Sequence, residues 1–147
     1  MKHGGNTERV EAFLDAVEAA GDAEGAVAAR LRRGETVPGF GHPLYPEGDP
    51  RAEALLGALA DTYSGSGARQ SAAGTAKAVG DLMDERPNVD FALVVLARTL
   101  KLPPGGALAL FALGRTVGWI GHAIEQYQAD RILRPRARYV GEQPAGL

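Results

Sequence analysis

One loop in the middle of the 147-residue chain gathers residue types that could do chemistry. The stretch VPGFGHPLYPEGDPRA, residues 37–52, places His42 between Gly41 and Pro43. Glycine lets a ligand or another backbone approach closely, and proline lowers the entropy lost when the imidazole is held in one place. His42 is therefore a candidate catalytic residue, although the alternative is an ordinary loop histidine with a structural role or none.

A second candidate is the carboxylate of Asp90 in the segment PNVDF, residues 87–91. Its simplest interpretation is structural, because aspartate commonly caps or flanks the start of a helix. Its neighbours Val89 and Phe91 are apolar, and a carboxylate in such surroundings could act as a general base. The residues alone leave both interpretations open.

Three arginines could bind an anionic substrate. Arg51 follows the Asp-Pro pair of the loop, in the first turn of a predicted helix, where a cation opposes the helix dipole and calls for an anionic partner. The planar guanidinium suits a carboxylate because it can bond both oxygens at once. Arg115 and Arg134 are further candidates, and the alternative for all three is a surface charge.

Several other functions lack the residues that they require. The chain has no cysteine, which excludes disulfides, thiolate zinc sites and cysteine nucleophiles and fits a reducing cytoplasm. Its histidines, at positions 3, 42 and 122, lack the short spacing of a helical metal site, so we predict no metal. The segment GFGHPL lacks the third glycine of a dinucleotide fingerprint. A net charge of −2 argues for neither nucleic acid nor a membrane, and the arginine-rich segment RILRPRAR, residues 131–138, is followed by a single aromatic residue.

Helices must position these residues, because no segment shows the sustained two-residue alternation of a strand. Asn6 and Thr7 are good cap types, Asp22 can cap a second helix, and Asp49 followed by Pro50 is a typical helix start. We predict an all-α chain with helices at residues 7–20, 22–33, 50–63, 68–85, 89–101 and 107–129.

The last predicted helix is apolar around most of its circumference from Ala107 to Ile124, so we expect it to need partners on several sides. The longest apolar run, Gly105 to Gly114, is far shorter than the roughly 20 residues of a membrane span, and Arg115 closes it. The N-terminal residues do not resemble a signal peptide. We therefore expect a cytoplasmic chain that does not bind a membrane.

Four segments, in order, resemble the C-terminal part of the citrate synthase family. HGGNTERVEAFLDAV resembles the segment that opens the small domain, and VPGFGHPLYPEGDPRA resembles the family's Gly-Tyr/Phe-Gly-His and Asp-Pro-Arg motif. PNVDF resembles the catalytic aspartate motif, and GRTVGWIGHAIEQYQADRILRPRARYVG is similar to the closing helix and Arg-Pro signature. The resemblance covers essentially the whole chain.

The resemblance implies that His3, His42 and Asp90 are catalytic. The aspartate would take a proton from the methyl group of acetyl-CoA while His3 hydrogen-bonds the thioester oxygen, and His42 would polarise the ketone of oxaloacetate. A thioester α-carbon is a very weak acid, so a base alone is insufficient without a donor placed where negative charge develops.

The resemblance also implies residues that bind the substrates. Arg51, Arg115 and Arg134 match the family's carboxylate-binding arginines, and the last of them reaches across a dimer to the neighbouring site. The coenzyme A thioester is a substrate, and no permanently bound cofactor is implied. The backbone that would lie against the coenzyme A adenine belongs to Val37, Pro38, Gly39, Phe40 and Gly41.

On the family plan, residues 1–102 form the small domain and residues 103–147 return to the large domain. The N-terminal bulk of a complete citrate synthase has no counterpart before His3 in this sequence. We therefore expect a homodimer or a complex with a separate large-domain chain, and the alternative is that the sequence is a fragment of a longer enzyme. Alternatives on the same scaffold are a citryl-CoA lyase and a 2-methylcitrate synthase. A third is a non-catalytic helical module that binds coenzyme A or serves dimerisation.

Overall fold

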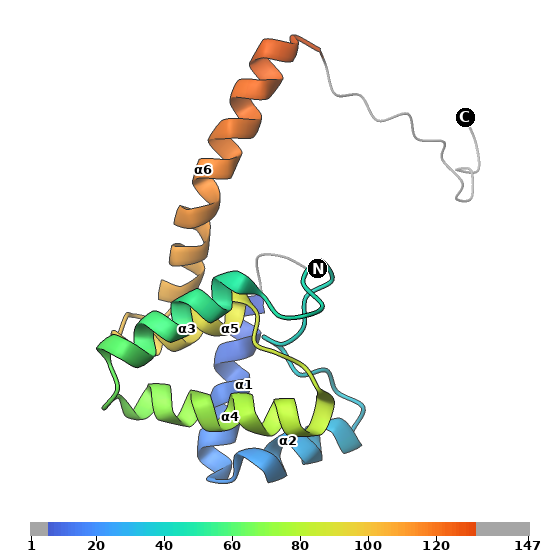
Figure 1. The fold of residues 1–147 in the computed structure, drawn as a ribbon, viewed down its shortest axis with the longest axis vertical. Helices are drawn as coiled ribbons and strands as arrows, with labels where there is room; N and C mark the ends of the chain where they lie inside the picture. The colour runs from blue at the N-terminus through green and yellow to red at the C-terminus, as the bar shows by residue number, and fades with distance from the viewer. Residues whose placement is uncertain (1–5, 132–147) are drawn as a thin grey trace, which may run out of the picture. The chain divides into compact units, whose positions relative to one another are not determined.

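The computed structural model describes residues 6–131, which fold into helices joined by turns and form no strand longer than an isolated bridge (Figure 1). The predicted all-α class is confirmed, and the observed helix bounds lie within about two residues of the predicted ones. The described residues divide into two units, which meet in the chain between Gly114 and Arg115. The helices are α1 (Asn6–Ala20), α2 (Ala23–Arg32), α3 (Pro50–Thr62), α4 (Gly67–Met83), α5 (Val89–Thr99) and α6 (Gly106–Ala129). The predicted division at residue 102 concerned the domains of a complete enzyme and stays a prediction.

Side-chain caps fix the starts of four of these helices, α2 to α5. Asp22 caps α2 and accepts a hydrogen bond from the Gly25 amide at 3.1 Å, as predicted. Asp49 caps α3, with Pro50 in the first helical position. Asn6, expected to be a cap type, instead lies within α1. Each cap satisfies amides that have no partner inside their own helix.

The core of the first unit forms on the apolar stripe of α1, whose residues Val10, Phe13, Leu14 and Val17 are all buried. Val10 and Leu14 pack with apolar residues of α3, α5 and the first turn of α6, and Phe13 and Val17 pack with those of α2 and α4. Phe40, from the loop before α3, packs against both groups. The loop is therefore anchored in the core.

A short backbone pairing holds that loop against the connection between α4 and α5. The Gly41 amide donates to the Arg86 carbonyl, and the Asn88 amide donates to the Gly39 carbonyl, each at 2.9 Å. Phe40 and Pro87 form an isolated antiparallel bridge between these two bonds. The pairing brings the segment that carries His42 beside the segment that carries Asp90.

Helix α6 is the longest of the described helices, yet Ala107 is the one buried residue among its 24. By length and composition it could cross a membrane, although the longest apolar run of the sequence ends at Arg115. Such a helix is weak evidence for a membrane, because the core helix of a soluble protein passes the same test. Its large exposed apolar side chains are Leu113, Val117, Trp119, Ile120, Ile124 and Tyr127.

Candidate active site

The imidazole of His42 is partly buried and held from two sides. Its Nδ1 accepts a hydrogen bond from the Leu44 amide at 3.1 Å, and its ring lies 4.8 Å from that of Tyr45. An Nδ1 that accepts must be unprotonated, so the neutral ring carries its proton on Nε2. Nε2 is therefore a donor that could polarise a carbonyl oxygen.

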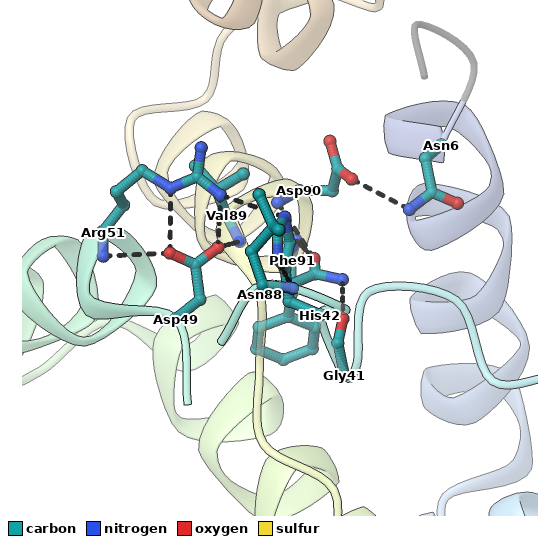
Figure 2. Close-up of polar contacts among 10 residues, drawn as sticks. Asn6, Gly41, His42, Asp49, Arg51, Asn88, Val89, Asp90 and Phe91 are labelled. Atoms are coloured by element: carbon teal, nitrogen blue, oxygen red, sulfur yellow. Dashed lines mark hydrogen bonds and ion pairs between the residues drawn. The ribbon is translucent and has the colours of Figure 1, made fainter. Parts of the chain in front are cut away.

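Arg51 has an anionic partner within the chain. Its Nε donates to Asp49 Oδ1 at 2.9 Å and its Nη2 donates to Asp49 Oδ2 at 2.8 Å, so the two groups form a bidentate pair (Figure 2). The Asp49 side chain is fully buried, whereas 49% of the Arg51 side chain is exposed. The predicted need for an anion at this helix start is thus met by Asp49, and about half of the Arg51 side chain stays exposed.

Asp49 also contacts the start of α5. Its Oδ2 accepts from the Val89 amide at 3.0 Å, and its Oδ1 accepts from the Arg51 amide at 3.1 Å. Burial tends to raise the pKa of Asp49, but the hydrogen bonds from Arg51 and Val89 outweigh it and lower that pKa below its usual value. Sequence reasoning identified Asp49 only as a cap, although an arginine two residues after an aspartate cap signals such a pair.

The same pair keeps Arg51 charged. The hydrogen bond to Asp49 raises the pKa of Arg51, burial opposes this, and the charges of Asp49, Tyr45 and Asp90 add to the rise. The guanidinium carbon also lies 5.3 Å from the centre of the Tyr45 ring, which favours a cation over its face.

Arg51 and His42 present neighbouring donors. Arg51 Nη2 lies 3.4 Å from His42 Nε2, longer than a good hydrogen bond. With Nδ1 of His42 already accepting, both of these nitrogens carry protons, so the contact places two donors side by side. Such a pair suits a ligand with two adjacent acceptor oxygens, such as an α-keto carboxylate.

Asp90 lies in the first turn of α5 and is partly buried. Asn88, and not Asp90, caps the helix, because its side-chain oxygen accepts from the Asp90 and Phe91 amides. Asp90 Oδ2 accepts from the side-chain amide of Asn6 at 2.9 Å, and Figure 2 shows its carboxylate pointing toward α1. Of the two structural roles considered for Asp90, capping is therefore wrong, whereas its place at the helix start is confirmed. Its second oxygen makes no protein hydrogen bond within residues 6–131.

The segment predicted to contact coenzyme A is mostly inside the fold. Val37, Pro38 and Gly39 are buried, and Phe40 and Gly41 are partly buried. The Gly39 carbonyl and the Gly41 amide are bonded to residues 86–88, and the Asn88 side chain donates to the Gly41 carbonyl at 3.0 Å. The predicted adenine contact stays a prediction.

The remaining predicted residues belong to other parts of the chain. Arg115 is exposed on α6, in the second unit, with its guanidinium over Gly118. His3 and Arg134 lie outside the described residues. Within residues 6–131, no group of three or more His, Asp or Glu side chains gathers as a metal site.

Two hollows adjoin the residues described above, and Asp49 lines both of them. One of about 300 Å³ opens between the start of α3 and the α4–α5 connection, and a second, which His42 and Tyr45 line, holds only about 10 Å³. The second is too small for a substrate, so the described part of this unit supplies functional groups at His42 without enclosing them. The larger hollow is lined by Gly48, Asp49, Ala52, Glu53, Leu56, Arg86 and Pro87.

Comparison with known proteins assigns the chain to a family. The family model described as "Citrate synthase, C-terminal domain" matches residues 1–136. The chain is 38% identical over 148 residues to a "Putative citrate synthase 2" of Mycobacterium tuberculosis, and the match covers 97% of this chain and 39% of that protein. The chain thus spans about two fifths of the length of its curated relatives.

Three solved structures share the fold. The citrate synthase of Thermotoga maritima superposes with a TM-score of 0.79 at 30% identity, over 99% of this chain and 41% of that one. A citryl-CoA lyase from Hydrogenobacter thermophilus gives 0.77 at 25%, over 99% and 60%. The citrate synthase of Thermoplasma acidophilum, in a ternary complex with carboxymethyl coenzyme A and oxaloacetate, gives 0.77 at 29%, over 99% and 41%. The chain belongs to the citrate synthase family and corresponds to its C-terminal domain.

Proposed function

We propose that the chain supplies the small-domain half of an active site that condenses acetyl-CoA with oxaloacetate. The observation that carries this is the pair of donors on His42 and Arg51, 3.4 Å apart and joined through Asp49 to the helix that carries Asp90. An α-keto acid has a ketone next to a carboxylate, which matches a neutral imidazole donor next to a guanidinium. The relative solved with carboxymethyl coenzyme A and oxaloacetate supports this substrate class.

In the proposed reaction, Asp90 takes a proton from the methyl carbon of acetyl-CoA while His3 donates a hydrogen bond to the thioester oxygen. The resulting enol or enolate attacks the ketone carbon of oxaloacetate, whose oxygen His42 polarises. That oxygen gains a proton and becomes the hydroxyl of citryl-CoA, which balances the proton that Asp90 removes. Water then cleaves the thioester to give citrate and free coenzyme A. Preorganised donors of this kind stabilise developing negative charge without reorganising at the moment of reaction.

The other walls of this site would come from a partner. The described hollow at His42 is too small for a substrate, and α6 exposes apolar side chains. We propose a separate large-domain chain or a homodimer in the cytoplasm, with Arg115 and Arg134 as further carboxylate ligands and Arg134 reaching a neighbouring subunit. No metal or permanently bound cofactor takes part.

A second candidate is cleavage of citryl-CoA. The likeness to a citryl-CoA lyase covers 60% of that chain, a larger share than for the citrate synthases. The same residues would serve, because carbon–carbon cleavage is the reverse of the bond-forming step. A 2-methylcitrate synthase or a non-catalytic module that binds coenzyme A remain the other outcomes of the test.

The test mixes the purified chain with acetyl-CoA and oxaloacetate, alone and with the product of any adjacent upstream reading frame, and follows the release of free thiol. We expect release only in the mixture. Citryl-CoA and propionyl-CoA, offered in parallel, separate the lyase and the methylcitrate synthase. Coenzyme A binding without turnover of any of these substrates would favour the non-catalytic module and contradict the proposed enzyme.

A further inference from the structure

We propose that Asp49 is a positioning residue. Its one buried carboxylate binds both the Arg51 guanidinium and the start of α5, and so fixes the position of Arg51 relative to the helix that carries Asp90. The proposal rests on the proposed function, because it concerns how the two halves of that site are held together. Asp49 touches both segments at once, and its side chain is fully buried (Figure 2).

The hydrogen bonds of Asp49 leave it no capacity to bind substrate. An ionised carboxylate offers about four acceptor positions, two on each oxygen. Oδ1 accepts from the amide and Nε of Arg51, and Oδ2 accepts from Nη2 of Arg51 and the Val89 amide. A carboxylate whose acceptors are all used acts through the groups that it holds.

The hydrogen bond from the Val89 amide to Asp49 is specific because of the position of Val89 in α5. Val89 is the first residue of α5, so its amide has no carbonyl partner within that helix. Asn88 caps the next two amides and leaves the Val89 amide to Asp49. The position of the Asp90 backbone therefore depends on a side chain from the other catalytic segment, 40 residues earlier in the sequence.

An asparagine at position 49 keeps the shape and the helix cap but cannot keep all of these bonds. Its amide nitrogen donates, so it would face either the Val89 amide or the Arg51 guanidinium, which are donors too. Asp49→Asn must therefore lose a hydrogen bond to either the Val89 amide or the Arg51 guanidinium. The matched control is Asp22→Asn, which changes the exposed aspartate cap of α2, whose side chain accepts from the Gly25 amide within its own helix start.

The first measurement needs no activity. Amide hydrogen exchange in the full 147-residue chain, followed by NMR, should show a protected Val89 amide that exchanges at least ~10-fold faster in Asp49→Asn, with no change in Asp22→Asn. If the Val89 amide exchanged at the same rate in the wild type, Asp49→Asn and Asp22→Asn, the proposed role of its hydrogen bond to Asp49 would be overturned.

The second measurement is kinetic, in whichever assembly releases thiol. We expect Asp49→Asn to raise the KM for oxaloacetate ~10-fold through Arg51 and to lower kcat ~10-fold or more through Asp90, because small misplacements of reacting groups are costly. Asp22→Asn should change neither by more than ~2-fold. Asp49→Asn kinetics like the wild type, with faster Val89 exchange, would overturn the positioning role while the proposed function stands. A wild-type chain that neither turns over substrate nor binds oxaloacetate would overturn both the proposed function and the positioning role. If the Val89 amide of that chain were still protected from exchange, the bonds of Asp49 would be purely structural.

Discussion

The loop of residues 37–52 is more firmly held than its composition suggests, and helix α6 is less buried than its composition suggests. The loop is rich in glycine and proline and would ordinarily be mobile, yet hydrogen bonds with residues 86–89 and the ring contact between Phe40 and Phe91 fix it. Helix α6 has the composition of a core element, yet a single residue of it is buried. A site can thus be ordered by a few directed bonds within one chain, whereas an apolar helix needs a second surface.

The exposed fractions of two valines, one on α5 and one on α6, show how differently these helices are buried. Val95 of α5 is 1% exposed, and Val117 of α6 is 76% exposed. Full burial of a valine side chain is worth about 1.5–3 kcal/mol, so α5 gains that stabilisation within the chain and α6 does not. The comparison predicts that changes in the loop and α5 alter chemistry or folding, whereas changes on α6 alter assembly.

The largest effect is expected from Asp90→Asn. The carboxamide that replaces the carboxylate could still accept from Asn6, so folding should change little, but it cannot take a proton. In an active assembly, exchange of the α-protons of acetyl-CoA with solvent, followed by NMR, should fall by about 10³-fold or more. The control is Asp61→Asn, which removes the same charge from an exposed position on α3. Unchanged exchange in Asp90→Asn would exclude Asp90 as the base.

Gly39→Ala tests how rigidly the loop is packed. Gly39 has φ of +89°, and an added Cβ would lie 2.9 Å from Cγ2 of Val10 and 3.1 Å from Cβ of Phe91. Backbone strain and overpacking together should lower the free energy of unfolding by about 3 kcal/mol, measured by urea denaturation.

The matched control is Gly34→Ala. Gly34 has a similar φ of +72°, but an added Cβ would meet nothing within 4 Å. Strain alone should cost about 1 kcal/mol. Equal losses in the two variants would show that Gly39 is required for its backbone angle and not for close packing of the loop on α1 and α5.

Most of the fold could be predicted from the sequence because its signals are local. Aspartate caps at positions 22 and 49 and the stripe from Val10 to Val17 are read within one turn or one helix. The site was harder, because the Asp49 bond to Val89 and the Asn6 bond to Asp90 join segments 40 and 84 residues apart. No spacing rule within a segment predicts such contacts, and only the family resemblance placed His42, Arg51 and Asp90 in one site.

A smaller effect is expected from pH. The pKa of Asp49 is lower in the folded chain than its ordinary value of 3.8. Its carboxylate therefore stabilises the fold above about pH 4, and this contribution is lost as the pH falls through the lower folded-state value. Asp49→Asn should cost about 1–2 kcal/mol in urea unfolding at pH 7, since the partner Arg51 is half exposed, and the loss should shrink as the pH falls through the folded-state pKa of Asp49. A loss that does not change with pH would contradict a stabilising ionised Asp49.

The smallest effect on the chain itself is expected from Val117→Lys on α6. The side chain is exposed, so the free energy of unfolding should change by less than about 0.5 kcal/mol, whereas Val95→Lys would bury an unpaired charge and cost more than about 3 kcal/mol. Light scattering should then show that Val117→Lys weakens the complex with the large-domain chain, or the homodimer, that the wild type forms. A wild-type chain that stays monomeric at high concentration and with every candidate partner would contradict the need for a covering surface. The exposed apolar side chains of α6 would then have to be tolerated in water, unlike the apolar stripe of α1, which is buried.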